Sequence, residues 1–372
     1  MSDPLFIGLA AGGAFLLSFL LYANPKNSNN KANKWLGVFV FTFACAMLEI
    51  FLHNLNLHRN HLVVLDLIEA SRFLSAPMLY LSVSFFTSTH KKIETGVLWH
   101  FALFLVVVLF RLPQMLTGEN FRFPNELTAR IVLTFFRIAL PLQTIIYWYL
   151  SFRKLQHHQD NIEQIASLTD EIDLSWLKYF LWILAAVVLI WFNLAIFNFQ
   201  PLFNYTPFLY LSSVYFLAYF ALKQREIYPY PKPALQELAV VIADRNTKTE
   251  KQKRLTESQS KVLNEKLEKL MHSEKVYLDN ELSLPALAQK MQISIHELSF
   301  LINEVHQENF FSFVNKYRIE EAKRLLLSEK FEKLNILGIA YQAGFNSKTT
   351  FNTAFKKLTG QSPSEFVQTE KK

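Results

Sequence analysis

Two stretches decide the fold of the last quarter of the chain: Leu287-Ala-Gln-Lys-Met-Gln-Ile-Ser294 and Ile339-Ala-Tyr-Gln-Ala-Gly-Phe-Asn346. Their apolar positions coincide, and each stretch reads as a short helix that ends in a turn. A second helix follows in both units. In the first unit it opens on the capping-box pattern Ser294-Ile-His-Glu297, and in the second it runs from Ser347 to Leu358 and ends at Gly360. One such pattern is weak evidence, but two in register predict a tandem helix-turn-helix domain.

A longer helix is expected between the two units, from Phe310 to Ser328. At 1.5 Å per residue it would be about 28 Å long. Two recognition helices held at its ends could enter successive major grooves, since half-sites one DNA turn apart lie about 34 Å from each other. Ser362-Pro363-Ser-Glu365 predicts one more capped helix near the C-terminus. The pattern therefore predicts an all-α domain over residues 276–372.

Two of these segments carry a resemblance to a known family. They are Asn315-Lys-Tyr-Arg-Ile-Glu-Glu-Ala-Lys-Arg-Leu-Leu326 and Ile339 to Lys356, with Gly360-Gln-Ser-Pro363 after them. Over about the last 95 residues the chain resembles the AraC/XylS family of transcription regulators. The resemblance implies sequence-specific binding to double-stranded promoter DNA and transcriptional control. It does not extend to the first 222 residues, which look like the multi-span sensor halves of some bacterial regulators.

The exposed positions early in each second helix are the candidate DNA contacts. By the resemblance, Lys348, Thr349 and Thr353 fall on base-reading positions. Lysine suits guanine and asparagine can pair with adenine, whereas the alternative for every candidate is ordinary exposed helix surface. The full candidate set is Ser347, Lys348, Thr349, Asn352, Thr353 and Lys356 in the second unit, and Ser294, His296, Ser299, Phe300 and Asn303 in the first.

The first unit departs from the family pattern. Phe300 stands where the family often has a basic residue, and Gln292 and Gln307 replace glycines at turns. The first unit is therefore expected to be less regular, with Phe300 reading a thymine methyl or packing on sugar, or to read little of the sequence. The domain holds twelve Lys and Arg against eleven Asp and Glu, so non-specific attraction to phosphate should be modest.

The rest of the chain has a different composition. Of 372 residues 51% are hydrophobic and only 19% are charged, against about 25% charged in soluble domains. Nearly all of the excess apolar sequence precedes residue 223, which excludes a one-domain soluble enzyme. A membrane-spanning helix needs about 20 apolar residues. Seven runs of near that length predict a seven-helix transmembrane bundle in residues 1–222: 4–23, 35–57, 62–87, 96–112, 128–151, 176–198 and 205–222.

The orientation follows from lysine and arginine in the short loops. With the C-terminus inside, the inner loops carry nine of these residues, and the outer loops carry four: Arg59, Arg111, Arg122 and Arg130. The N-terminus is therefore expected outside and the DNA-binding domain in the cytoplasm. This predicts an integral protein of the bacterial inner membrane.

Ionisable residues inside the runs are costly in lipid and mark candidate function. Under this topology they lie mostly in the outer half of the bundle. We expect an outward-opening pocket for an unknown ligand, and the alternative is structural ion pairs, such as Arg137 with Glu49 or with Asp66. The candidate ligand-binding residues are Glu49, Asp66, Glu69, Arg72, Arg137 and Asn193.

The composition of residues 223–275 predicts a basic, partly helical juxtamembrane linker. Pro229, Pro231 and Pro233 predict an extended exit from the membrane, and residues 245–275 hold nine Lys and Arg against five Glu. Leu263, Leu267 and Leu270 have helical spacing. This segment is either a dimerising helix or a solvated linker that touches anionic lipid.

No catalytic motif stands out, so we expect no enzyme activity, no cofactor and no metal site; His157-His158 is expected to be solvated. The leading hypothesis is a membrane-bound one-component transcription regulator that binds promoter DNA as a homodimer and responds to a ligand from the outer side. One alternative is a transporter-like or channel domain with a regulatory DNA-binding part. The other is a membrane scaffold whose cytoplasmic domain binds protein.

Overall fold

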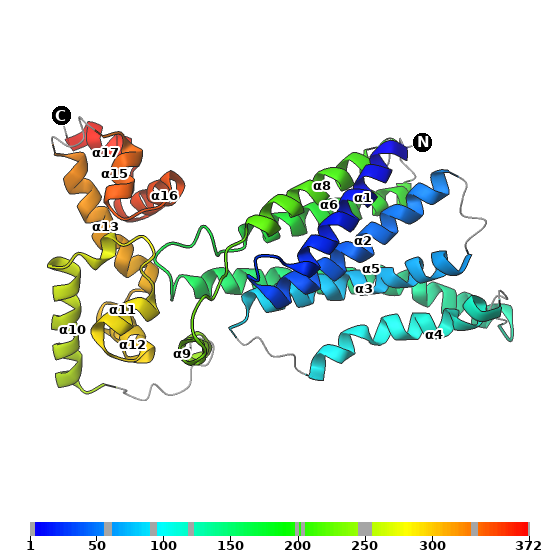
Figure 1. The fold of residues 1–372 in the computed structure, drawn as a ribbon, viewed down its shortest axis with the longest axis horizontal. Helices are drawn as coiled ribbons and strands as arrows, with labels where there is room; N and C mark the ends of the chain where they lie inside the picture. Colours follow the sequence, from blue (N-terminus) through cyan, green and yellow to red (C-terminus); the bar gives the residue numbers. More distant parts are fainter. Residues whose placement is uncertain are drawn as a thin grey trace. The chain divides into compact units, whose positions relative to one another are not determined.

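The computed structural model describes residues 4–55, 62–89, 95–117, 123–197, 201, 205–244, 255–328 and 334–370. Arg59, Lys91, Lys92, Arg122 and the first part of the basic segment, residues 245–254, lie outside the described residues. The described residues form helices, with one isolated β-bridge and no strand, as predicted for an all-α chain (Figure 1). They divide into two compact units, residues 1–156 with 174–227 and residues 157–173 with 228–372.

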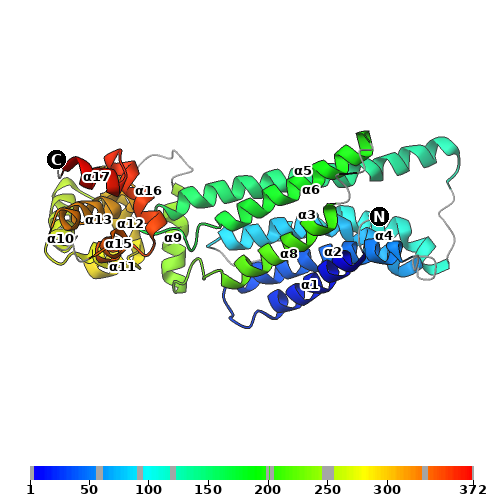
Figure 2. The same cartoon turned by 90° about the horizontal axis from the view of Figure 1, so that it is seen from above.

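In the first unit a helix overlaps each of the seven predicted apolar runs (Figure 2). These helices are α1 (Pro4–Ala23), α2 (Asn30–Asn54), α3 (Leu62–Thr87), η2 with α4 (Thr95–Phe101 and Ala102–Thr117), α5 (Glu126–Ile162), α6 (Ser175–Phe197) and α8 (Thr206–Lys223).

The tightest packing in this unit is between α1 and α2. The hydroxyl of Ser18 donates to the carbonyl oxygen of Gly37 at 2.8 Å. A Cβ on Gly37 would lie 3.0 Å from the carbonyl oxygen of Ser18, so a side chain here would require the two backbones to move apart by a few tenths of an ångström. Small residues at such crossings are typical of helices that pack in lipid. Around this pair, α8 packs on α1, α3 on α2, α4 on α3 and α6 on α8.

Four of these helices are long and apolar enough to cross a membrane: Pro4–Ala23, Asn30–Asn54, Gly96–Thr117 and Glu126–Ile162. Two shorter apolar helices are Ser175–Ile190 and Phe208–Lys223. Helix α3, which carries Asp66, Glu69 and Arg72, is not among these candidate spans. The count of seven spans therefore stays a prediction. The outer surface of the unit is nonetheless apolar, with exposed Leu16, Phe19, Leu109, Leu133, Ile138 and Leu189.

The second unit is built from shorter helices. These are α9 (Lys232–Asp244), α10 (Glu257–His272), η3 (Val276–Leu278), α11 (Leu284–Met291), α12 (Ile295–Val305), α13 (Phe310–Leu326), α15 (Ile336–Gln342), α16 (Lys348–Thr359) and α17 (Pro363–Glu370). The predicted capping boxes form at Ser294 with Glu297 and at Ser362 with Glu365. Gly360 ends α16 in the left-handed conformation, as predicted.

Helix α10 has a different place from the one that its sequence suggested. Leu267 and Leu270 are buried, and the helix packs on α12 and η3 within its own unit. Lys266 donates to the backbone carbonyl of Met291 at 2.7 Å. The apolar stripe of residues 257–272 is therefore covered within the same chain, and a role of this helix in dimerisation stays a prediction. A spacing of apolar residues shows that a helix has a buried face, but not which surface covers it.

The two helix-turn-helix units share their turn geometry. In the first, the N–H of Ile293 donates to the carbonyl of Ala288 at 3.1 Å, and in the second the N–H of Phe345 donates to that of Ala340 at 2.9 Å. Both turns need positive φ, which Gly344 supplies in the second unit and Gln292 supplies at φ 55° in the first. A side chain at positive φ is unfavourable. The unfavourable φ of Gln292 is the structural consequence of the departure that the sequence indicated, a glutamine in place of a glycine at this turn.

Arg318, in the middle of α13, ties the parts of the second unit together. Its side chain is fully buried, and its guanidinium donates to the backbone carbonyls of Tyr277 at 2.7 Å and Asp279 at 2.8 Å. The same group donates to the hydroxyl of Ser167 at 2.9 Å and lies 5.7 Å from the ring centre of Phe345. Burial lowers the pKa of Arg318 to about 9, which leaves the group charged at neutral pH. Gly344 is required beside it, because a Cβ there would lie 2.6 Å from the carbonyl oxygen of Tyr277.

The connection between α5 and α6 belongs to this unit. Ser167 bonds to the carbonyl of Leu282 through its hydroxyl at 2.6 Å, and Glu163 accepts the N–H of Phe311 on its carbonyl at 2.9 Å. Residues 157–173 thus pack with the C-terminal helices, whereas the predicted boundary at residue 222 had assigned them to the membrane domain.

His158 shows why the sequence was misleading here. It was expected to be solvated, but it is buried, with Nε2 3.0 Å from the carbonyl oxygen of Ile172. Burial lowers its pKa to about 4, so the imidazole is neutral at physiological pH. The segment was expected to be solvated because its own sequence is polar. That sequence does not record which other part of the chain will pack over it.

Arg318→Met is expected to loosen the second unit strongly. It leaves the Tyr277 carbonyl and the Ser167 hydroxyl buried without this donor, and each such group costs about 1–3 kcal/mol. Hydrogen exchange of the amides in α13 should become at least about a hundredfold faster in the full chain. The matched control is Arg324→Met on the same helix, where the side chain is exposed and pairs only with Glu321. Similar exchange rates in both variants would contradict the central role of Arg318.

Candidate functional site

The second recognition helix, α16, presents the predicted contact residues at its N-terminal half. Lys348, Thr349 and Thr353 are exposed, and Asn352 is half-buried beside them. The opposite face is held in the core by Phe351, Ala354 and Phe355, which are all buried. The alternation arises because residues three and four apart share a helix face. Lys356, one turn further on, is exposed as well.

The first recognition helix, α12, carries a less polar set. Measured from the capping serines Ser294 and Ser347, His296 corresponds to Thr349, Phe300 to Thr353 and Asn303 to Lys356. His296 and Phe300 are half-buried, and Asn303 is exposed.

Three predicted contacts have other partners. Ser299 is only 9% exposed and accepts a hydrogen bond from Asn303 at 3.2 Å, so it is not presented as DNA-facing surface. The hydroxyls of Ser294 and Ser347 accept the N–H groups of Glu297 and Thr350 and so cap α12 and α16.

Each recognition helix also has a carboxylate at its N-terminus that comes from outside the helix-turn-helix units. The Oδ2 of Asp170 accepts the hydroxyl of Ser347 at 2.8 Å and also that of Thr350. The Oε2 of Glu237, in α9, accepts the backbone N–H of Ile295 at 2.9 Å. A negative charge is favourable at this end of a helix, because free N–H groups and the helix dipole are positive there.

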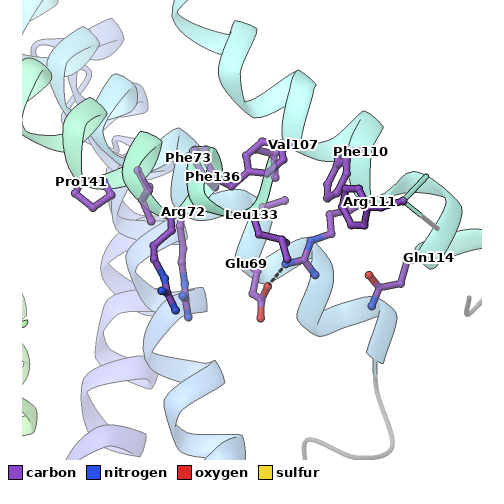
Figure 3. Close-up of a pocket in the computed structure, with 14 residues that line it drawn as sticks. Glu69, Arg72, Phe73, Val107, Phe110, Arg111, Gln114, Leu133, Phe136 and Pro141 are labelled. Carbon is purple, nitrogen blue, oxygen red and sulfur yellow. Dashed lines mark hydrogen bonds and ion pairs between the residues drawn. The ribbon is translucent and has the colours of Figure 1, made fainter. Parts of the chain in front are cut away.

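In the first unit a cavity of about 570 Å³ lies between α3, α4 and α5 (Figure 3). Phe73, Val107 and Phe136 gather on one side of it, and the charged ends of Arg72 and Glu69 lie on the other. Its volume is in the usual range of small-molecule pockets, about 300–1,000 Å³.

The predicted ligand-binding residues have different places around this cavity. Glu69, Arg72 and Arg137 line it. Glu49 and Asp66 do not line it but pair with its arginines, whereas Asn193, in α6, is not part of its lining. The ion pairs suggested from sequence, Arg137 with Glu49 or with Asp66, were wrong. Glu49 instead forms an ion pair with Arg72 at 2.5 Å, and Asp66 forms one with Arg111 at 2.8 Å.

Sequence reasoning missed Arg111, Asp170 and Glu237. Arg111 was counted as an outer-loop residue at the end of the fourth apolar run, but α4 continues to Thr117 and brings it against Asp66 and Glu69. Two carboxylates three residues apart on α3 were the signal that a cation faces them. No sequence signal existed for Asp170 or Glu237, since each acts on a helix far along the chain.

Comparison with known proteins assigns part of the chain to a class. The family model of a helix-turn-helix domain, of the AraC type, matches residues 287–369. It covers α11 through α17 almost completely and supports a DNA-binding transcription regulator. Neither the curated proteins nor the solved structures include one that matches this chain.

Lys348→Ala together with Asn352→Ala is expected to abolish sequence-specific binding and leave the fold intact. Each lost base contact should cost about 1–3 kcal/mol, so the two losses together should weaken binding to the specific site about thirtyfold or more. The measurement is the dissociation constant for specific and scrambled DNA at fixed salt. Lys316→Ala, an exposed lysine on α13, serves as the charge-matched control. Unchanged specific binding by the double variant would remove these residues from the recognition role.

Proposed function

We propose that this protein is a membrane-bound, one-component transcription regulator that binds promoter DNA in a sequence-specific manner. The observation that carries the proposal is the pair of helix-turn-helix units joined by α13, with α16 presenting Lys348, Thr349 and Thr353. Helix α13 has 17 residues, which span about 26 Å. That length suits two recognition helices in successive major grooves, whose centres lie about 34 Å apart.

The proposal places the first unit in a bacterial inner membrane. It is supported by the four helices with membrane-spanning length and composition and by the apolar outer surface of the unit. Large exposed apolar patches are rare on soluble monomers and mark surfaces that contact a membrane or a partner. The distribution of lysine and arginine favours an N-terminus outside and a DNA-binding unit in the cytoplasm.

Control of DNA binding by a signal is part of the proposal. The cavity between α3, α4 and α5 is the candidate site of signal binding, with Glu69, Arg72 and Arg137 as ligand contacts. A ligand can shift the protein only by binding two states differently. The chain itself offers a route between the parts, because residues 157–173 pack in the DNA-binding unit and continue directly into α5 and α6. We propose that two copies act together on DNA.

The test is in vitro selection of bound sequences from random DNA, with the full chain in lipid nanodiscs. The full chain is needed because Arg318 is bonded to Ser167, which a C-terminal fragment would lack. We expect an enriched motif with two elements about one helical turn apart, bound at least about a thousandfold more tightly than unrelated DNA.

The variant with Lys348→Ala and Asn352→Ala is the control and should enrich nothing. No enrichment by the folded wild-type protein would contradict the proposal and favour a membrane scaffold that binds protein.

A further inference from the structure

Three arginines line the cavity in the first unit, and two of them, Arg72 and Arg111, form ion pairs. Arg72 pairs with Glu49 at 2.5 Å, and Arg111 bridges Asp66 at 2.8 Å and Glu69 at 2.7 Å. Arg137 also lines the cavity but forms no ion pair or hydrogen bond with any residue in the described part of the chain.

A guanidinium without a partner is costly at membrane depth. Arg137 lies in α5, within one of the helices that has membrane-spanning composition. In this environment an arginine attracts any anion that reaches it and offers it two parallel N–H donors. The missing partner of Arg137 is therefore expected to be an anionic group that the described part of the chain does not supply.

The rest of the cavity determines what that anion is attached to. Phe73, Val107 and Phe136 form an apolar side next to the charged groups, as Figure 3 shows, and Phe110 also lines the cavity. Aromatic and branched side chains gain free energy when they bury apolar surface, about 25 cal/mol per Å². A small inorganic anion would leave these surfaces uncovered.

We propose that the cavity binds an amphiphilic anion, with its carboxylate or phosphate on Arg137 and its apolar chain against the phenylalanines. This rests on the proposed function, since it names the chemical class of the signal. Such a molecule is either a diffusible carboxylate with an alkyl chain or an anionic lipid of the bilayer.

The experiment uses the full chain in phosphatidylcholine nanodiscs and a palmitate analogue that carries a photoreactive diazirine on its chain. A trimethylammonium analogue with the same chain is the matched probe. After illumination, mass spectrometry locates the labelled residues. We expect the carboxylate probe, and not the cationic one, to label the segments of α3, α4 and α5 that line the cavity. Arg137→Gln should reduce that labelling about tenfold or more, since hydrogen bonds to charged groups contribute about 1.5–3 kcal/mol.

Arg130→Gln is the control, because Arg130 is exposed on the same helix and does not line the cavity. Competition by unlabelled dodecanoate would support a diffusible source, and competition by phosphatidylglycerol in the nanodisc would support a lipid source. Equal labelling by both probes, or labelling that Arg137→Gln leaves unchanged, overturns the proposal. Because labelling does not involve DNA, its failure is distinguishable from a failure of DNA binding.

A second inference rests on a separate observation, the carboxylates at the two recognition helices. Asp170 occupies the N-terminus of α16 and Glu237 that of α12. Neither belongs to a helix-turn-helix unit. Asp170 lies between α5 and α6, and Glu237 lies in α9, which follows α8 after a short connection. Both carboxylates therefore stand on segments that the chain connects directly to the apolar helices.

The position that they occupy is one that DNA would use. The N-terminus of a helix binds anions such as phosphate through its free N–H groups and its dipole. Asp170 accepts the hydroxyls of Ser347 and Thr350, and Glu237 accepts the N–H of Ile295, so a backbone phosphate at either position would meet a negative charge that already holds these donors. Ser347, which bonds Asp170, is also one of the candidate DNA contacts.

We infer that Asp170 and Glu237 hold the recognition helices in a state of weak DNA affinity. A change in α5, α6 or α8 that withdraws either segment frees one helix for DNA. This inference rests on the proposed function as well, and it adds an autoinhibitory contact at each helix.

The experiment compares Asp170→Asn, Glu237→Gln and the double variant, each as the full chain in nanodiscs without added ligand. Removing the carboxylate charge should tighten binding to the selected DNA about fivefold or more in each single variant and further in the double one. The salt dependence of the affinity should become steeper, by about one phosphate contact for each helix that is freed. Glu171→Gln removes an equal charge from an exposed neighbour of Asp170 and controls for general electrostatic attraction.

Unchanged or weaker DNA binding by Asp170→Asn and Glu237→Gln would show that the carboxylates only cap their helices, and would overturn the inference. An equal gain in Glu171→Gln would overturn it too. If the wild-type chain and every variant bind no DNA sequence preferentially, the proposed function itself fails, which is a different result.

Discussion

The buried guanidinium of Arg318 is the interaction on which the DNA-binding unit depends. A charge removed from water must find its full set of hydrogen-bond partners, or the structure that buries it is unstable. The partners of Arg318 lie on three separate parts of the chain. They are the carbonyls of Tyr277 in η3 and of Asp279 directly after it, Ser167 in the connection between α5 and α6, and Asn315 on the same helix as Arg318. It also lies over Phe345, in the second turn. Arg318 thus ties η3 and the connection to α13, and the second helix-turn-helix unit packs on the same helix through an apolar core that includes Ile319, Ala322 and Phe351.

This arrangement makes the connection between α5 and α6 a structural part of the DNA-binding unit. Ser167 accepts a hydrogen bond from Arg318, the carbonyl of Glu163 accepts the backbone N–H of Phe311 in α13, and Leu168 packs against the core around Phe351. We propose that this segment, which continues into α5 and α6 at its two ends and contacts α16 at Asp170, carries the signal between the two parts of the chain. In our proposal, the same segment both stabilises the unit through Ser167 and restrains α16 through Asp170.

Much of the DNA-binding unit could be predicted because the signals are local. The capping boxes at Ser294 and Ser362, the glycine at 360 and the buried face of α16 each depend on residues within a few positions of one another. The candidate ligand site was predicted in part: Glu69, Arg72 and Arg137 share the cavity, but the pairing of the charges was wrong. Which carboxylate meets which arginine depends on how far each helix extends and how it is turned, and the apolar pattern of α4 gave no warning that Arg111 would lie inside the bundle.

The sequence by itself determined the helical class, the apolar half, the tandem repeat and the face of α16 that carries Lys348 and Thr349. These follow from periodicity and capping, which act over one or two helical turns. Only the tertiary structure decided that α10 is buried within its own unit, that His158 is neutral and buried, and that Asp170 meets Ser347 across 177 positions of sequence. The reason is physical: hydrogen bonds and burial between distant segments depend on the packing of whole helices, and no local pattern of residues records which surfaces will meet.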